Sequence, residues 1–335
     1  MTALVLRSGL LTSIQDLGRH GLQHLGIVPC GAMDTVSHRI ANALVGNTAD
    51  CATLECTVLG PDLLFEQAVL IACYGAQFDA RCESKPLPMN RPVWLPAGSK
   101  LKLGAAVRGA RTYLAVAGGF QTPLVMSSRS TYMPAGFGGF EGRALRKNDR
   151  VSLHAAVSEL SQARFSRLSR RGDKPSGTLR SVAWSAPSLT LSGSQHAGIR
   201  AIAGRNFDQF DTASQTRFFE STWKISSESN RMGYRLLGPE LQRTKRIEII
   251  SEPTCLGTIQ VPNSGAPIVL MADHQTTGGY PKFAEVASVD IPELAQLAPG
   301  ATFRFVQCDL NAAVQARRAM DHLVASVCQS IAWEF

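Results

Sequence analysis

The chain consists largely of short apolar or alternating segments separated by turn-forming residues. Gly, Pro, Asn and Asp bound these segments, which is typical of strands and tight turns in a sandwich or a barrel. The clearest segments are residues 3–6, 69–74, 100–103, 113–117, 247–250, 258–261, 268–272 and 302–306. We therefore predict a mainly β protein.

Helical periodicity is scarce and is confined to two places. Residues 40–45 form an apolar run that ends at Gly46, a typical helix stop. After Asp309, apolar side chains recur at helical spacing, and Arg317 and Asp321 lie off that face. We predict a few short helices and one C-terminal helix.

The two halves of the chain share an ordered set of features. Arg19 and Arg231 each precede two glycines at the same spacing. Other matched pairs are Glu55 with Glu252, residues 68–70 with 268–270, and residues 100–103 with 302–305. Separations that stay near roughly 200 residues, with small slips, are expected of a duplicated unit with loop insertions. We predict two related lobes, residues 1–155 and 181–335.

The net charge of +8 is compatible with nucleic-acid binding, but its distribution argues against it. Residues 161–180 contain six basic side chains and one acidic one. Gly, Pro and Ser in the same stretch favour a solvated linker over a folded binding face. We predict a basic linker at residues 156–180 and no nucleic-acid partner.

Length and composition limit the class of protein further. A chain of 335 residues with 44% hydrophobic residues is long enough for two packed cores. No apolar run approaches the roughly 20 residues that span a bilayer. The first residues lack the features of a secretion signal. We therefore expect a cytoplasmic protein without a membrane partner.

Cysteine and histidine offer one superficial metal pattern. His20, His24, Cys30 and His38 are ligand types that suit zinc. Their spacing matches no zinc module, and neighbouring glycines favour a loop, so we predict no metal site. The eight cysteines are scattered without a C-x-x-C motif, and most are expected to be reduced core residues.

The densest polar stretch is residues 271–282, directly after a strand that we expect to be buried. Gly278 and Gly279 let backbone N–H groups approach a ligand closely. We predict a site here, with Asp273 and Tyr280 as candidates for proton transfer. An ordinary Gly-Gly turn, in which Asp273 satisfies backbone groups, is the alternative.

Further candidates lie outside this loop. Glu252 and Gln260 interrupt strand-like sequence ahead of it, and Arg129 and Arg143 lie among hydroxyls and glycines, where a guanidinium suits a carboxylate or phosphate. Gln275 completes the catalytic candidates. The substrate or anion-binding candidates are Glu55, Arg129, Arg143, Arg231, Arg235, Glu252, Gln260, Thr276, Thr277, Gly278, Gly279 and Lys282. No P-loop, dinucleotide or G-x-S-x-G motif is present, so the residues alone assign no ATP site.

Eight ordered motifs carry a resemblance to a known family. They are Gln15–Gly21, Gly31–Asp34, Asn42–Asn47, Leu54–Glu55, Tyr113–Gly119, Ser128–Thr131, Arg231–Leu236 and Gln275–Pro281. Together they resemble the KipA-type biotin-dependent carboxyltransferase family, from about residue 7 to residue 306. Two departures are His274, where the family more often has Arg, and Ser127, where it usually has Gly.

The resemblance implies two cyclophilin-like β-barrel lobes and a multisubunit enzyme that requires its partners. The implied reaction is the ATP-dependent opening of 5-oxo-L-proline to L-glutamate. Two partner subunits are implied, one of the KipI type and one of the LamB/YcsF type, with ATP assigned to the complex. We expect the site in a groove between the lobes, mainly on the second, with Arg129, Arg143 and Glu55 contributing across it.

Two other functions stay open. One is carboxyl transfer from a biotin carrier to urea or another amide, as in the second subunit of allophanate hydrolase. This chain lacks a carrier sequence and a biotin carboxylase domain, so partner chains would supply both. The other is a non-catalytic role in which the chain antagonises a KipI-type kinase inhibitor.

Overall fold

The computed structural model describes residues 1–154, 158–170, 178–190, 198–244 and 249–334. The chain forms two compact units. The first contains Met1–Arg19, Asp34–Leu191 and Leu323–Phe335, and the second contains His20–Met33 and Ser192–His322. The predicted lobes, residues 1–155 and 181–335, therefore share most of their residues with these units, but three short segments belong to the opposite unit.

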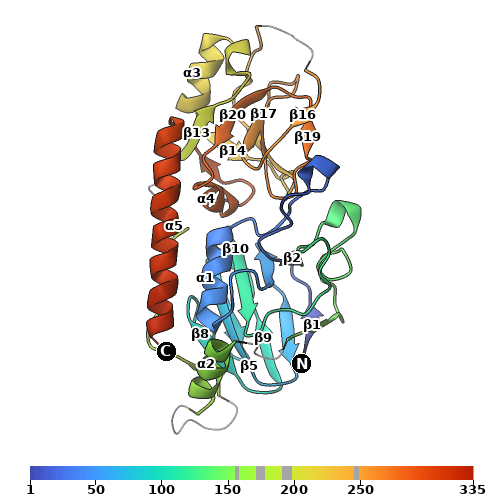
Figure 1. Ribbon diagram of the computed structural model, residues 1–335, viewed down its shortest axis with the longest axis vertical. Coiled ribbons are helices and arrows are strands. Elements are labelled where there is room, and N and C mark those ends of the chain that lie inside the picture. The colour runs from blue at the N-terminus through green and yellow to red at the C-terminus, as the bar shows by residue number, and fades with distance from the viewer. Residues whose placement is uncertain (155–157, 171–177, 191–197, 245–248, 335) are drawn as a thin grey trace. The chain divides into compact units, whose positions relative to one another are not determined.

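The first unit contains two six-stranded sheets (Figure 1). Their strand orders are β11-β1-β4-β9-β6-β7 and β12-β8-β5-β10-β3-β2. The strands are β1 (Thr2–Arg7), β2 (Leu11–Gln15), β3 (Thr53–Thr57), β4 (Asp62–Phe65), β5 (Val69–Phe78), β6 (Arg81–Cys82), β7 (Lys85–Pro86), β8 (Pro92–Leu95), β9 (Ser99–Lys102), β10 (Ala106–Val116), β11 (Arg150–Ser152) and β12 (Arg180–Ser181). Apolar side chains from both sheets form one buried core.

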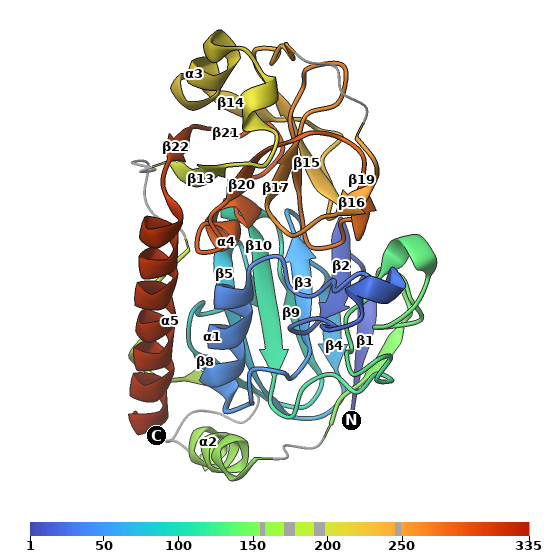
Figure 2. The ribbon, with the colours of Figure 1, turned by 45° about the horizontal axis from the view of Figure 1, so that its top comes forward.

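Helix α1 (Thr35–Val45) packs against β5 and β10 (Figure 2). Its N-terminus is capped by the Asp34 carboxylate, which accepts a hydrogen bond from the Ser37 N–H at 2.8 Å. Its C-terminus ends at Gly46, whose φ of +81° favours glycine. The predicted helix at residues 40–45 is confirmed, and it begins one turn earlier because the capping residue lies at Asp34.

The second unit contains an eight-stranded sheet, ordered β21-β14-β15-β18-β17-β20-β13-β22, and a two-stranded sheet, β16-β19. The strands are β13 (Ile199–Ala203), β14 (Trp223–Ile225), β15 (Gly233–Leu237), β16 (Glu252–Pro253), β17 (Thr258–Gln260), β18 (Ile268–Leu270), β19 (Thr277–Gly278), β20 (Lys282–Val286), β21 (Thr302–Phe303) and β22 (Phe305–Gln307). The short helices are α3 (Thr212–Glu220) and α4 (Ile291–Ala295). In the core, Phe218 stacks on Phe305 with ring centroids 4.5 Å apart.

The described residues also include three single-turn 3-10 helices: η1 (Gln23–Leu25), η2 (Met133–Ala135) and η3 (Phe207–Gln209). Helix α5 (Leu310–Trp333) confirms the predicted C-terminal helix. The mainly β prediction is also confirmed, and seven of the eight predicted strand segments overlap observed strands. In the eighth, residues 247–248 lie outside the described residues, and Ile249 and Ile250 belong to no strand.

The predicted basic linker differs from the structure. Residues Glu159–Arg170 form helix α2, in which Arg164 and Leu168 are buried. The polar composition concealed this helix because its buried face includes an arginine. Residues 171–177 of the predicted linker lie outside the described residues.

The matched segments of the two halves show both agreement and difference. Gly98 and Gly300 precede β9 and β21, and both adopt positive φ, +78° and +90°. By contrast, Glu55 lies within β3 in a six-stranded sheet, whereas Glu252 lies in the two-stranded sheet. Among the described residues, no helix combines the length and hydrophobicity needed to cross a bilayer.

Candidate functional site

The predicted loop of residues 273–282 lies in the second unit, between β18 and β20. Midway along it, Thr277 and Gly278 form β19, which pairs with Glu252 and Pro253 of β16. This pairing brings the loop next to the end of β17 and the start of β20. We call Glu252, Thr254, Gln260, Gln275 and Lys282 the polar cluster, because contacts among their atoms and the β16–β19 backbone connect them.

Asp273, the first candidate for proton transfer, is engaged in a buried ion pair. The Arg231 guanidinium donates two hydrogen bonds to its carboxylate, each 2.9 Å long. Arg231 also donates to the Gly31 carbonyl at 2.7 Å. Asp273 is 1% exposed and Arg231 is 2% exposed. These two residues therefore hold the start of the loop, and neither presents a free charge at the surface.

Gln260 is buried, with 2% of its surface exposed, and one of the two polar atoms of its side-chain amide has a hydrogen-bond partner. The Gln275 amide donates to its oxygen at 3.4 Å. Its nitrogen, Nε2, has no hydrogen-bond partner among the described residues. A Cβ added to Gly278 would lie 2.7 Å from this nitrogen, so the glycine leaves room for the amide. A buried donor without a partner is costly, which is a common feature of a ligand site.

Lys282 places a cation at the edge of the polar cluster. Its Nζ donates to the Pro253 carbonyl at 2.5 Å and lies 3.7 Å from the Glu252 carboxylate. Glu252 also accepts from Arg205 at 2.7 Å. The Lys282 side chain is 11% exposed, so this cation is held in place by the β16 backbone.

His274 carries no charge near neutral pH. Burial lowers the pKa of its imidazole, more than the nearby Gln275 carbonyl and Asp273 carboxylate raise it. Its Nδ1 lies 2.7 Å from the Gln275 carbonyl, which only accepts, so Nδ1 carries the proton. The position where the family more often has Arg is thus neutral here.

The remaining second-unit candidates are less enclosed. Tyr280 is 49% exposed. The Thr276 carbonyl accepts from the Thr254 N–H. Thr277 of β19 and Gly279 are exposed. Arg235 lies on β15 and approaches Glu228 at 3.6 Å. It pairs with Ile268 of β18, which in turn pairs with Gln260 of the polar cluster.

The three candidates of the first unit do not converge. Glu55 is buried within β3, where the Tyr113 hydroxyl donates to it at 2.7 Å. Arg143 forms ion pairs with Asp149 at 2.7 Å and Glu141 at 2.5 Å. Arg129 lines a cavity of the first unit. The structure describes each unit by itself, so the predicted groove between lobes stays a prediction.

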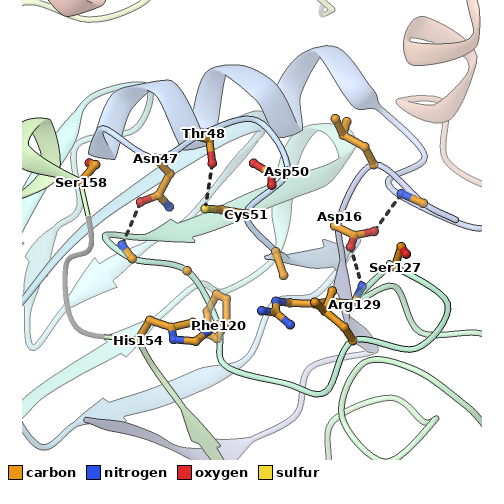
Figure 3. A pocket seen from close by; sticks show the side chains of 16 residues that line it. Asp16, Asn47, Thr48, Asp50, Cys51, Phe120, Ser127, Arg129, His154 and Ser158 are labelled. Carbon is orange, nitrogen blue, oxygen red and sulfur yellow. Dashed lines mark hydrogen bonds between the residues drawn. The ribbon is translucent and has the colours of Figure 1, made fainter.

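The cavity beside Arg129 has a volume of about 540 Å³ (Figure 3). Its walls come from the loop after β2, the end of α1 and the segments that follow β10 and β11. The lining side chains include Asp16, Asn47, Thr48, Asp50, Cys51, Phe120, Ser127, Arg129, His154 and Ser158. Four of the motifs that carry the family resemblance contribute to these walls.

Asp16 fixes the loop that carries Arg129. Its carboxylate accepts from the hydroxyls of Ser128 and Ser130 at 2.7 and 2.5 Å, and from the backbone N–H groups of Arg129 and Gly18 at 2.5 and 2.8 Å. Burial by itself raises the pKa of this carboxyl, but the four hydrogen bonds outweigh it and hold the pKa below its ordinary value. Asp16 therefore acts as a fixed anionic anchor.

Sequence reasoning missed most of this cavity. Asp16 and Asn47 were recognised within family motifs, but no local signal indicated that they lie on one surface. His154 had no signal, because it follows an ordinary edge strand. Asn47 illustrates why the sequence does not reveal the cavity. Its side-chain amide nitrogen donates to the Val116 carbonyl and to the Asn42 side-chain oxygen, and its oxygen accepts from the Gly118 N–H. These contacts exist only in the folded chain.

The fold and these motifs define a carboxyltransferase-type domain. Residues 25–307 match the carboxyltransferase domain family, subdomains A and B. The match covers most of the chain, and the chain therefore belongs to this family.

The similarity to individual relatives is more specific. The chain is 40% identical to the C subunit of 5-oxoprolinase from Escherichia coli over 314 residues, which cover 94% of each protein. It is 36% identical to the C subunit of 5-oxoprolinase from Haemophilus influenzae over 309 residues, which cover 91% of each.

A solved structure with a similar fold is that of Kluyveromyces lactis urea carboxylase. The TM-score is 0.85 and the identity is 29%, over 97% of this chain and 29% of that one. The likeness supports the mainly β fold and shows that a related domain occurs within a much longer enzyme.

Proposed function

We propose that this chain is the C subunit of a 5-oxoprolinase, which converts 5-oxo-L-proline to L-glutamate with ATP hydrolysis and two partner subunits. The observation that carries the proposal is the 40% identity to the Escherichia coli protein over 94% of both chains. One partner would be of the KipI type and the other of the LamB/YcsF type. We place the complex in the cytoplasm as part of the same proposal.

The polar cluster suits the chemistry of lactam opening. Attack on the lactam carbonyl places negative charge on its oxygen before the C–N bond breaks. Preorganised donors stabilise such an oxygen. Gln260 Nε2 is a buried donor without a partner among the described residues, and Lys282 Nζ adds positive charge at the same cluster. Tyr280, which is 49% exposed and lies two residues before Lys282, is our candidate for passing a proton to the departing nitrogen.

The test of the reaction is to co-express the three subunits and measure ATP-dependent release of glutamate from 5-oxo-L-proline. Release that requires this chain supports the proposal. An assembled complex that releases no glutamate would contradict it. Carboxylation of urea in the presence of a biotin carboxylase and carrier would instead favour carboxyl transfer, the activity that the urea carboxylase likeness suggests.

The test of the site is Gln260→Leu. Losing one oxyanion donor lowers kcat by about 10²–10³-fold. Because the amide nitrogen of Gln260 is buried without a described partner, the substitution is expected to leave the free energy of unfolding unchanged or higher.

Lys224→Met provides a matched surface control for Lys282→Met. Lys224 is exposed on β14, so its variant is expected to retain full turnover, whereas Lys282→Met is expected to lose it. Wild-type glutamate release by Gln260→Leu and Lys282→Met would remove the polar cluster from the mechanism.

A further inference from the structure

The cavity of the first unit has no part in the proposed lactam chemistry, which uses residues of the second unit. Its walls come from four separate stretches of the chain, which begin at Asp16, Asn47, Gly118 and His154. Its volume, about 540 Å³, lies within the usual range of small-molecule sites. The class of ligand that it would hold follows from which polar groups of its walls still lack a partner.

Several polar side chains of the cavity wall are already satisfied by the protein. Asp16 accepts four hydrogen bonds, and Asn47 uses both the nitrogen and the oxygen of its amide. The Ser158 hydroxyl donates to the Gly46 carbonyl at 2.6 Å. Groups that already have their partners gain little from a ligand. These residues therefore shape the cavity, and other residues would bind its occupant.

Arg129 supplies a positive charge that no counter-ion neutralises. One of its terminal nitrogens donates to the Thr122 carbonyl at 2.6 Å, which orients the guanidinium. Within the described part of the chain, Arg129 forms no ion pair. The neighbouring Met126 and Ser127 adopt positive φ, +51° and +62°, and backbone strain of this kind is concentrated at functional sites. A fixed planar guanidinium is the usual partner of a carboxylate.

Asp50 supplies the opposite charge. It lines the same cavity from the segment that follows α1. Among the described residues, its carboxylate forms no ion pair and accepts no hydrogen bond. Figure 3 shows Asp50 and Arg129 on opposite sides of the cavity. A free carboxylate suits an ammonium group, which only donates. The cavity therefore offers one uncompensated charge of each sign.

The other walls limit the rest of the ligand. Burial, followed by the nearby Arg129, lowers the pKa of His154, so its imidazole is neutral at pH 7 and adds no second cation. A phosphate or a second carboxylate would therefore meet a single guanidinium beside two carboxylates of the wall. Leu17 and Leu124 supply apolar surface. These features fit a zwitterion with an uncharged, partly apolar side chain.

We propose that this cavity binds a free α-amino acid with an uncharged side chain. Arg129 binds the α-carboxylate, and Asp50 accepts from the α-ammonium group. The amino-acid side chain lies against Leu17 and Leu124. The ligand differs from the substrate of the proposed function, because the lactam nitrogen of 5-oxo-L-proline carries no ammonium charge. The inference therefore does not depend on the proposed function and gives the first unit a binding role of its own.

The experiment is isothermal titration calorimetry of the purified chain with L-leucine, an amino acid of this class. Saturable binding is expected. The analogue 3-methylbutan-1-amine, which is leucine without its carboxylate, is expected to bind at least about 10-fold more weakly, because it loses the charge-assisted hydrogen bonds to Arg129. The analogue 4-methylpentanoate, which is leucine without its ammonium group, is expected to bind about 3-fold more weakly, because it loses an exposed ion pair.

Variants of the cation test the carboxylate contact. Arg129→Gln is expected to raise the Kd for leucine at least about 10-fold. Arg129→Lys keeps the charge and loses the planar fork, so an intermediate Kd is expected. The matched control is Arg150→Gln, because Arg150 is exposed and pairs with Glu66, and its Kd should equal that of the wild type. Thermal unfolding of each variant shows whether the fold is retained.

A variant of the anion tests the ammonium contact. Asp50→Asn is expected to raise the Kd for leucine about 3-fold, because Asp50 is exposed and exposed ion pairs are weak. Asp208→Asn is the matched control, at an exposed position of η3 in the second unit, and should leave the Kd unchanged.

Three results would overturn the inference. The first is a folded wild-type chain that does not bind leucine at millimolar concentration. The second is an unchanged Kd in a folded Arg129→Gln variant. The third is binding of 4-methylpentanoate as tightly as leucine, or displacement of leucine by an equal concentration of inorganic phosphate, which would indicate a site for simple anions. Glutamate release is not measured in any of them, so the proposed function is tested separately.

Discussion

Asp273 illustrates how a single residue changes meaning once its partners are known. From the sequence it is a candidate acid, and its replacement should abolish turnover while leaving the fold intact. In the structure its carboxylate is buried and doubly bonded to Arg231. Removing one partner of such a pair leaves a buried charge without compensation. Loss of activity in an Asp273 variant would therefore not by itself identify a catalytic residue.

The corresponding prediction concerns stability. Asp273→Ala is expected to lower the free energy of unfolding by about 3–5 kcal/mol. The double variant Arg231→Met/Asp273→Leu is expected to recover most of that loss, because both charges are removed together. Urea unfolding of the three proteins provides the measurement. Exposed ion pairs contribute less than about 1 kcal/mol to the free energy of unfolding. A loss of that size in Asp273→Ala would therefore contradict a buried ion pair between Arg231 and Asp273.

A second residue-scale prediction concerns pH. His38 is fully buried between the Thr53 hydroxyl and the Ala49 carbonyl, and burial lowers its pKa below 6.5. Below about pH 6.5 the unfolded chain binds a proton that the folded chain does not. Stability is therefore complete above that pH and falls as the pH drops, by at most about 1.4 kcal/mol per pH unit for this group.

Urea unfolding between pH 7.5 and 5 measures this dependence. His38→Gln is expected to reduce the slope, whereas His322→Gln, at an exposed position on α5, should reproduce the wild-type curve. Identical slopes in all three proteins would exclude His38 as the source.

At the scale of single elements, the strands and the C-terminal helix were predictable because apolar spacing alone specifies them. Helix α2 was not, because its composition is that of a linker. Arg164 on α2 is buried, and its guanidinium donates to the carbonyls of Ala43 and Ile331, near the C-termini of α1 and α5. A cation at a helix C-terminus is favourable, but sequence does not show which helices will meet it.

Arg164 thus links α2 to both α1 and the C-terminal part of α5 through hydrogen bonds. Arg164→Ala is expected to destabilise the protein by about 1–3 kcal/mol, because buried carbonyls lose their donor. Arg167→Ala provides the matched control on the same helix. Arg167 is exposed and donates to the Glu334 carbonyl at 3.3 Å, so we expect a change within about 0.5 kcal/mol. Chemical unfolding of both variants measures the two free energies of unfolding. Equal losses would contradict a stabilising role of the Arg164 hydrogen bonds.

For the whole molecule, the sequence indicated two lobes but not how the chain is shared between them. The segment His20–Met33 belongs to the second unit, and Leu323–Phe335 belongs to the first. Such exchanges leave no local pattern, because each segment looks like an ordinary loop or helix.

The candidate site was only partly predictable from the sequence. The loop of residues 273–282 was visible as a dense run of polar residues, whereas the cavity of the first unit depends on long-range contacts.

Removing residues 323–335 tests this division. Val324 and Ile331 are buried, and Ile331 supplies an acceptor for Arg164. The truncated protein is expected to be less stable in its first unit. Hydrogen exchange should then show faster exchange in α1 and α2 than in the second-unit sheet. Equal protection of α1 in both proteins would show that the first unit is complete without these residues.

The division of α5 between the units also bears on biosynthesis. Domains usually fold as they leave the ribosome, the N-terminal one first. Here the first unit includes the last turns of α5, which are translated after the whole second unit. The carbonyl partners of Arg164 in the first unit therefore stay incomplete until the second unit has been synthesised. Because residues 323–335 join the first unit only after the second unit has been synthesised, we expect chaperones to bind the first unit during translation.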